Sequence, residues 1–130
     1  MKPKTPKQLK SKADQLFSIY IRKKYANSDG YVKCYTCDKA YPIKEIQCGH
    51  FVRRVHLSTR WDEDNCRPQC FACNVWKKGN YDEFALRLVN EMGYDVLPRL
   101  NCKKNEICKM TKSKYEALIS ELEDKIVKLI

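Results

Sequence analysis

Cysteine and histidine are the residues of this chain best suited to chemistry, and most of them fall in one central stretch. Four of the eight cysteines form two C-x-x-C pairs, Cys34 with Cys37 and Cys70 with Cys73. Two pairs of thiolates can hold one zinc ion tetrahedrally, and such a closed site leaves no open coordination position. We therefore expect a structural zinc. The segment between the pairs exceeds the usual ribbon spacing and contains both histidines, so it should be a folded unit.

A histidine and two asparagines lie inside or directly beside this cysteine frame: His50, Asn65 and Asn74. Hydrolysis of a phosphodiester needs an activated water, charge relief on the phosphate and help for the leaving oxygen. One histidine acting as general base and one divalent cation can supply all three. The alternatives are ordinary ones. His50 could be a zinc ligand or a packed core histidine, and both asparagines could serve in turns and caps.

The order strand, strand and helix, with a cysteine knuckle opening the helix, resembles the HNH or ββα-metal nucleases, in the variant with Asn in the third position. With the linking residues included, the ordered set resembles the phage NinG (Rap) recombination proteins over roughly residues 11–95. The segments that carry the resemblance are Cys34-Tyr35-Thr36-Cys37, Gly49-His50-Phe51, Arg60-Trp61-Asp62-Glu63-Asp64-Asn65-Cys66, Gln69-Cys70-Phe71-Ala72-Cys73-Asn74 and Gly79-Asn80.

This resemblance implies a structure-selective endonuclease that cuts branched DNA such as Holliday junctions and D-loops. It implies that His50 is the general base and that Asn74 ligates a catalytic Mg²⁺ or Mn²⁺. Asn65 would hydrogen-bond within the loop and hold its shape. The two cysteine pairs would bind the structural zinc, and the protein would act as a phage protein in a bacterial host.

The sequence departs from the general HNH pattern at Gly49. Many members carry an acidic residue or a histidine just before the catalytic histidine, as a metal ligand. Glycine has no ligand to offer at this position. Asp62 or Asp64 could take its place, or water could fill the coordination shell.

The strong positive charge indicates a polyanionic partner. The net charge is +10 and the sequence pI is about 9.2, and nucleic acid is the commonest partner of such a protein. An anionic membrane surface would also suit the charge, but the sequence has no apolar run of spanning length and no signal peptide. We therefore expect a cytoplasmic protein with reduced thiols that binds DNA by backbone and shape. The candidate phosphate contacts are Arg53, Arg54, Arg60, Lys77 and Lys78.

The other four cysteines are weaker signals. Cys48 and Cys66 flank the histidine and asparagine positions, and they could pack as small buried residues. They could also build a second metal site with His50 or His56. No role is assigned to the two isolated cysteines, Cys102 and Cys108.

We expect the elements that position these residues to form an α+β fold. The resemblance implies a small zinc-stapled ββα-metal (HNH-like) core with flanking N-terminal and C-terminal helices. We expect a flexible basic arm over 1–10, a nuclease domain over 11–95 and an extension over 96–130. A chain of 130 residues builds only a modest core, so a structural metal would help it. The expected helices are 11–25, 70–79, 81–92 and a last helix from about 113; the expected strands are 31–33, 43–52 and 66–69; residues 94–110 show no period.

The last helix carries an apolar stripe with coiled-coil-like spacing. The stripe could pack on its own domain or form a homodimer seam, and a dimer would suit symmetric cutting of a junction. Two further functions remain open from the sequence: a non-catalytic zinc module that binds nucleic acid, and a zinc-stapled adaptor that dimerises through this helix. The stripe consists of Tyr115, Ile119, Leu122, Ile126 and Leu129.

Overall fold

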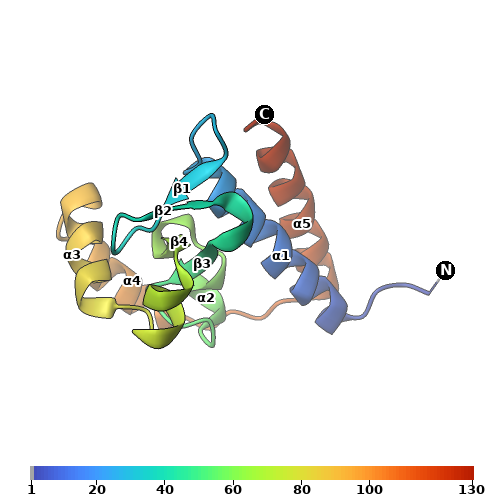
Figure 1. The fold of residues 1–130 in the computed structure, drawn as a ribbon. Coiled ribbons are helices and arrows are strands. Elements are labelled where there is room, and N and C mark those ends of the chain that lie inside the picture. Colours follow the sequence, from blue (N-terminus) through green and yellow to red (C-terminus); the bar gives the residue numbers. More distant parts are fainter. Residues whose placement is uncertain (1) are drawn as a thin grey trace.

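The computed structural model describes residues 2–130, and Figure 1 shows their arrangement. Five helices and four short strands are joined by three single turns of other helical types. The helices are α1 (Pro6–Lys24), α2 (Leu57–Arg60), α3 (Tyr81–Met92), α4 (Val96–Lys104) and α5 (Lys112–Val127). The strands are β1 (Tyr31–Lys33), β2 (Ala40–Pro42), β3 (Gln47–His50) and β4 (Cys66–Gln69), and the turns are η1 (Ile43–Glu45), η2 (Glu63–Asn65) and η3 (Ala72–Trp76).

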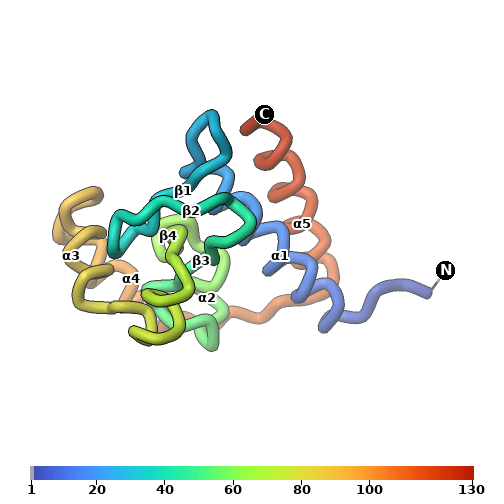
Figure 2. The backbone as a smooth tube through the Cα atoms, in the orientation of Figure 1, coloured from blue at the N-terminus to red at the C-terminus, as the bar shows by residue number. Residues whose placement is uncertain are grey.

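Two antiparallel ribbons, β1–β2 and β3–β4, form the centre of the molecule. In the second ribbon the register runs from Gln47 opposite Gln69 to His50 opposite Cys66. Helices α1 and α5 lie on one side of the ribbons, and α3 and α4 lie on the other (Figures 1 and 2). The candidate residues on β3 and β4 are therefore enclosed by elements from both ends of the chain.

Helix α1 begins at Pro6, which corrects the expected start at Ser11 and shortens the expected flexible arm. The Thr5 side chain accepts from the backbone N–H of Gln8, and the Gln8 side chain accepts from the backbone N–H of Thr5. This reciprocal capping box, together with proline at the first helical position, specifies a helix start. The lysine-rich composition of this segment is typical of a flexible arm, and it therefore favoured the wrong prediction.

Helix α5 packs along α1, and the two helices run in the same direction (Figures 1 and 2). Tyr115, in the first turn of α5, packs with Ala13, and Leu122 packs further along with Leu16. Both α5 residues are buried. Most of the apolar stripe therefore packs on its own domain, whereas Leu129 at its end is exposed.

Other expectations are met in part. The strands over 31–33 and 66–69 and the helix over 81–92 are confirmed. The single strand expected over 43–52 is wrong, because η1 interrupts it and only Gln47–His50 pairs with β4. The helix expected over 70–79 is shortened to the π-helical turn η3. Residues 94–110 contain a helix that the sequence did not suggest, since α4 buries only Val96 and Leu100 and carries a proline.

The described residues contain no helix that is both long enough and apolar enough to cross a membrane.

The contact between α5 and α1 predicts a stability effect. Replacing buried Leu122 by Ala should lower the free energy of unfolding by about 2–5 kcal/mol, because it removes core methyl groups and leaves a cavity. Val127→Ala, on an exposed position of the same helix, is the matched control. Denaturant unfolding of both variants measures the difference, and equal stability of the two would contradict the packing of α5 on α1.

Candidate functional site

The four paired cysteines meet in one cluster. The sulfurs of Cys34, Cys37, Cys70 and Cys73 all lie within 4.8 Å of one another, and those of Cys37 and Cys70 are 3.8 Å apart. Zinc–sulfur bonds of about 2.3 Å in a tetrahedron put the sulfurs about 3.8 Å from each other. The donor set and its spacing therefore fit a structural zinc ion.

Backbone hydrogen bonds hold the two cysteine turns against the β3–β4 ribbon. The N–H of Tyr35 donates to the carbonyl oxygen of Pro68 on β4, and the N–H of Asn74 donates to that of Cys70. Burial alone would raise the pKa of Cys34, but the backbone N–H of Cys70 and the Thr36 hydroxyl outweigh it and lower that pKa to about 7. The second cysteine turn thus fixes the start of the segment that carries Asn74.

His50 is held in one tautomer. Its Nε2 lies 2.9 Å from the carbonyl oxygen of Arg60. A carbonyl can only accept a hydrogen bond, so Nε2 carries the proton and Nδ1 carries the free lone pair. Burial disfavours the imidazolium and lowers the pKa of His50 to about 4. The ring is therefore neutral at pH 7, with one nitrogen available as a base or a ligand.

Asp14 of α1 stabilises the segment that holds His50. Its carboxylate accepts from Arg60 Nε at 2.9 Å and from Arg60 Nη2 at 2.6 Å. Trp61 Nε1 donates to the same carboxylate at 2.9 Å. Burial alone would raise the pKa of Asp14, but the Arg60 guanidinium holds it below its usual value. The carbonyl that accepts from His50 is thus anchored to the first helix.

Asn65 closes the loop between β3 and β4. The N–H of Val52 donates to Asn65 Oδ1 at 2.6 Å, and Asn65 Nδ2 donates to the carbonyl oxygens of Val52 at 3.0 Å and Thr59 at 3.1 Å. The side chain is fully buried. These three hydrogen bonds of a buried amide hold the conformation of the loop. Asn65 does not line the cavities beside His50.

Asn74 and His50 line the same two neighbouring cavities, of about 430 and 310 Å³. Helix α1 supplies a wall of the larger one through Asp14 and Phe17. Asn74 Nδ2 donates to Gln47 Oε1 at 2.8 Å. Because the nitrogen is used in that bond, the amide oxygen of Asn74 is the atom left for a ligand.

Gly49 is required by close packing. A β-carbon at this position would lie 1.9 Å from Gln69 Oε1. The Gln69 side chain cannot easily give way, because it is buried and its Nε2 donates to Thr36 at 3.1 Å and to the carbonyl oxygen of Gly79 at 2.9 Å. The position before the histidine therefore lacks a ligand for a steric reason.

Neither acidic candidate for the catalytic cation lies at the His50 cavities. Asp62 pairs with Lys103 at 2.7 Å, and Asp64 pairs with Arg99 at 3.0 Å. Asp62 lines a different cavity, formed with α4 and α5. The structure therefore gives no support to Asp62 or Asp64 as a replacement for a ligand at Gly49, because both carboxylates pair with basic residues of α4.

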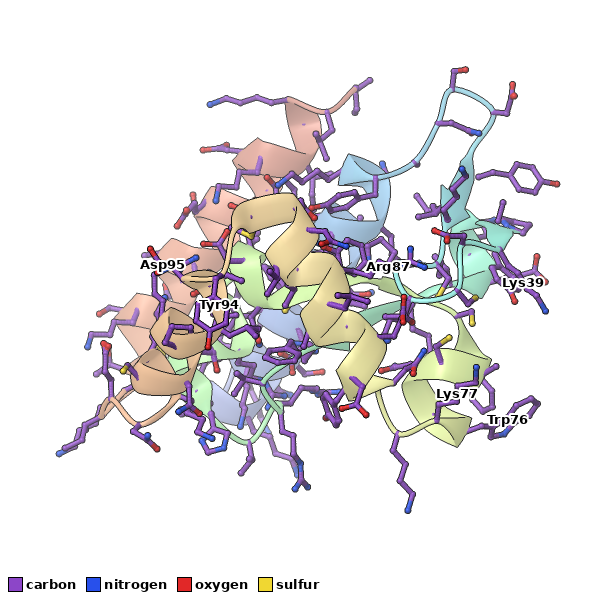
Figure 3. The ribbon with its side chains drawn as sticks, turned by 90° about the vertical axis from the view of Figure 1, so that its left-hand side faces the viewer. Lys39, Trp76, Lys77, Arg87, Tyr94 and Asp95 are labelled. Atoms are coloured by element: carbon purple, nitrogen blue, oxygen red, sulfur yellow. The ribbon has the colours of Figure 1, made fainter. Side chains whose placement is uncertain are left out.

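The basic candidates divide into two kinds. Arg53 and Arg54 are exposed and line the His50 cavities. Lys77 and Lys78 are exposed beyond Asn74, and Figure 3 shows Lys77 and Trp76 projecting from that turn. Arg60 is removed from the candidate phosphate contacts, because its side chain is 10% exposed and its guanidinium is paired with Asp14.

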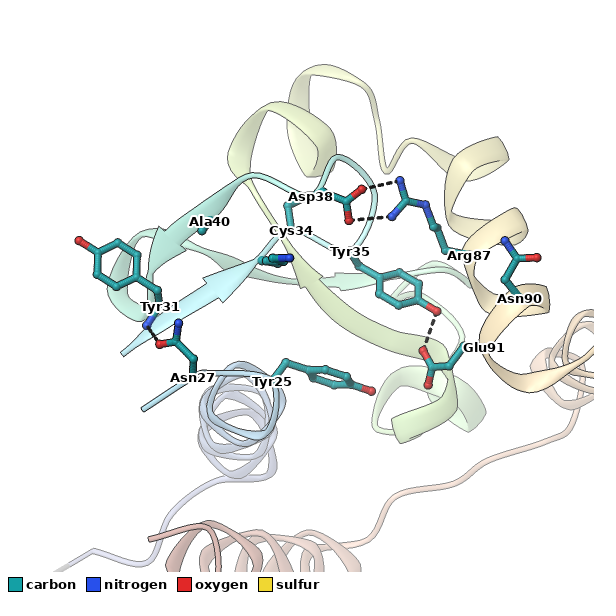
Figure 4. A pocket seen from close by; sticks show the side chains of 11 residues that line it. Tyr25, Asn27, Tyr31, Cys34, Tyr35, Asp38, Ala40, Arg87, Asn90 and Glu91 are labelled. Carbon is teal, nitrogen blue, oxygen red and sulfur yellow. Dashed lines mark hydrogen bonds and ion pairs between the residues drawn. The ribbon is translucent and has the colours of Figure 1, made fainter. Parts of the chain in front are cut away.

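A larger cavity, of about 640 Å³, lies away from His50, between the β1–β2 ribbon and α3 (Figure 4). Its polar groups pair with one another. Tyr35 donates to Glu91 at 2.7 Å, and Arg87 binds Asp38 through two hydrogen bonds. We assign the chemistry to the smaller cavities, because this one lacks a histidine and its acidic groups are satisfied.

Two residues important to the site are not apparent from the sequence. Asp14 lies on α1, far along the chain from the Arg60 guanidinium that it binds. Arg67 is buried, binds Glu91 through Nε and one terminal nitrogen, each at 3.2 Å, and lies against the rings of Tyr25 and Tyr35. A charged residue at an alternate strand position is ordinarily solvent-facing, so only the three-dimensional contacts show that it ties β4 to α3.

The remaining four cysteines fall into one pair that lies near His50 and two isolated residues. Cys48 and Cys66 form a cluster with His50 in which the three ligand atoms lie within 4.8 Å of one another. His56 does not belong to it. Cys102 is exposed, and neither it nor Cys108 takes part in a potential metal cluster among the described residues.

The fold and the site are those of a small mixed helix-and-sheet protein with a four-cysteine cluster suited to zinc. The chain belongs to the NinG family, since the family model described as "Bacteriophage Lambda NinG protein" matches residues 1–130. It is 26% identical over 117 residues to Protein ninG of Escherichia phage 933W, covering 85% of this chain and 56% of that protein. Protein ninG of Escherichia phage lambda is 24% identical over 117 residues, with 85% and 55% covered.

The chain thus spans little more than half the length of these curated relatives. A further relative, Protein ninG of Salmonella phage P22, shows the same proportion: 24% identity over 119 residues, 86% of this chain and 56% of that protein. No solved structure matches the fold.

The four-cysteine cluster predicts metal-dependent stability. Cys73→Ser should lower the free energy of unfolding by at least about 3 kcal/mol in zinc-loaded protein, because binding energy at a structural zinc contributes directly to folding. Cys102→Ser, at the exposed isolated cysteine, is the control. Thermal unfolding with and without a chelator measures both. Chelator-insensitive unfolding of the parent protein would contradict a structural metal.

The buried neutral state of His50 predicts how stability varies with pH. The pKa in the folded protein, about 4, lies below the unfolded value of about 6.5. The contribution of neutral His50 to folding stability is therefore fully present above the unfolded pKa, and it is lost as the pH falls towards 4. Between about pH 7.5 and 5, protonation of His50 should lower the free energy of unfolding by about 2 kcal/mol. The His50→Gln variant should lack this decrease. His56→Gln is the matched control, and an unchanged slope in His50→Gln would contradict the shifted pKa.

Proposed function

We propose that this protein is a metal-dependent endonuclease that hydrolyses phosphodiester bonds in branched DNA, such as four-way junctions and D-loops. One observation carries the proposal. A neutral histidine with a fixed lone-pair nitrogen and an asparagine with a free amide oxygen line the same cavities. The motif order that resembles HNH nucleases supports the reaction, and membership of the NinG family supports the choice of substrate.

His50 would act as the general base. Its Nε2–H is held by the Arg60 carbonyl, so Nδ1 accepts the proton of the water that attacks the phosphorus. Asp14 keeps that carbonyl in place through Arg60 and Trp61. A positioned base of this kind contributes about 10²–10⁴ in rate. The lowered pKa keeps the imidazole in its basic, unprotonated form at neutral pH.

Asn74 would supply an amide oxygen to a Mg²⁺ or Mn²⁺ ion. Such an ion, when bound, relieves negative charge on the phosphate and assists the leaving oxygen. Asp14 is the one carboxylate among the residues that line the two cavities, and it is already paired with Arg60. The DNA phosphate and water must therefore complete the coordination shell, which Mg²⁺ readily accepts.

The β3–β4 ribbon followed by η3 would then be the ββα-metal unit of an HNH nuclease. The ribbon carries His50, the connecting loop is closed by Asn65, and the turn after the second cysteine pair carries Asn74. The zinc would fix that turn against the ribbon. The acidic position that many such nucleases use is filled here by Gly49 for the packing reason given above.

The positive rim of the cavities supports DNA as the substrate. Arg53 and Arg54 border the cavities, and Lys77 and Lys78 extend the charge along the next turn. Lysine and arginine neutralise phosphates without reading bases, so recognition would depend on backbone and shape. The alternative of a dimeric adaptor is disfavoured, because the apolar face of α5 is already buried on α1.

The proposal is tested by cleavage of a four-way junction and a matched linear duplex. Zinc-loaded protein should cut the junction in Mg²⁺ or Mn²⁺ and leave it intact in EDTA. His50→Ala and Asn74→Ala should each lower the rate by about 10²-fold or more, because each removes one part of the hydrolytic pair.

His56→Ala and Asn105→Ala are the matched controls, since both residues lie outside the two cavities. Folded, zinc-loaded protein that binds the junction but never cuts it would contradict the nuclease and favour a non-catalytic nucleic-acid-binding module. Equal cutting by His50→Ala would remove that residue from the mechanism.

A further inference from the structure

Two cysteines and the proposed base form a second group of metal-ligating side chains. Cys48 and His50 lie two residues apart on β3, so their side chains leave the same face of the ribbon. Cys66 lies directly opposite His50 on β4. The sulfur atoms and an imidazole nitrogen lie within 4.8 Å of one another. The pairing register itself thus brings three ligands together, and the cluster shares no residue with the four-cysteine site.

We propose that Cys48, His50 and Cys66 form a second binding site for a thiophilic divalent cation, zinc in particular. Two thiolates and an imidazole are a ligand set that zinc prefers over harder ions. In a tetrahedral site the ligand atoms are about 3.5–3.8 Å apart. The ligand atoms therefore need to approach one another by about 1.3 Å at most.

Charge and burial suit a bound cation. Cys66 is fully buried against α1, in a cluster that includes Phe17 and Leu16. An isolated thiolate is costly in such surroundings, whereas one divalent ion with two thiolates and a neutral imidazole carries no net charge. Cys48 and His50 also line the larger of the two cavities, so an ion can enter from there and a water molecule can occupy a fourth position.

Occupancy of this site would control the proposed nuclease, a consequence that rests on the proposed function. A neutral imidazole has one nitrogen with a free lone pair. A ring that donates this lone pair to a cation cannot also accept a proton from water. Zinc at Cys48, His50 and Cys66 and general-base catalysis by His50 therefore exclude each other, and zinc beyond the structural equivalent should inhibit cleavage.

Metal binding is tested directly with Co²⁺, which reports thiolate ligands by charge-transfer absorption. Under reducing conditions, full-length protein already loaded with one zinc should take up one further equivalent of Co²⁺, with thiolate-to-cobalt bands. Cys48→Ala and Cys66→Ala should each remove most of that absorption while zinc at the four-cysteine site is retained. The double variant Cys102→Ala/Cys108→Ala should bind as the parent does. Circular dichroism and zinc content show which variants remain folded.

Folded parent protein that stops at one metal equivalent would overturn the site. Mass spectrometry adds a second readout, since a Cys48–Cys66 disulfide that persists under reducing conditions would also overturn it. Uptake that survives in both cysteine variants would place the ion elsewhere and have the same consequence.

A cleavage assay in Mg²⁺ separates the site from the proposed function. Parent protein with one zinc should cut the junction, and the rate should fall at least about tenfold as the second equivalent binds. Thiolate–cobalt absorption together with no cleavage at any zinc level would retain the site and contradict the nuclease. Cleavage by the one-zinc protein with no second equivalent bound would retain the nuclease and overturn the site.

Discussion

The antiparallel register of β3 and β4 is the constraint on which the rest of the structure depends. Successive residues of a strand point to opposite faces, so a slip of one residue would turn His50 away from α1 and place Gly49 there. Hydrogen bonds fix the register at both ends. Asn65 closes the loop at one end through Val52, and at the other the first cysteine turn binds the carbonyl oxygen of Pro68.

The two faces of this ribbon have different tasks. The face towards α1 carries Cys48, His50 and Cys66, and Asp14 of that helix anchors the carbonyl that orients the imidazole. The opposite face carries Gly49, Arg67 and Gln69, where space is filled tightly and a buried guanidinium links β4 to α3. Arg67 is buried and its partner Glu91 is partly exposed, so removing the Glu91 carboxylate would leave a buried guanidinium without its ion-pair partner. One face of this short ribbon thus carries the candidate site, and the opposite face carries the packing contacts.

The sequence predicts most of the residues in the site, because metal ligands and turn residues carry information in their type and spacing. The two C-x-x-C pairs, the strands over 31–33 and 66–69 and the helix over 81–92 could all be recognised in this way. Contacts between distant segments could not. Nothing local shows that Asp14 binds Arg60, or that Asp62 is paired with Lys103 and so lost as a cation ligand.

The misplaced elements have different physical causes. The first helix starts early because a capping box outweighs a lysine-rich composition. Helix α4 has little periodicity of its own and is held by packing of Val96 and Leu100 against Phe84 and Leu88. The strand expected over 43–52 is broken by η1, which directly follows Pro42. Local signals therefore decided the first and last of these cases, and tertiary packing decided α4.

The proposed function requires a hard divalent cation to act beside His50 and Asn74, on the α1 side of the ribbon. The most direct test is paramagnetic broadening of amide resonances when Mn²⁺ is added to zinc-loaded, isotope-labelled protein, alone and bound to a four-way junction. We expect broadening in the complex to be centred on His50, Arg54 and Asn74. Broadening centred on Asp62 and Asp64, or no localised broadening, would contradict it.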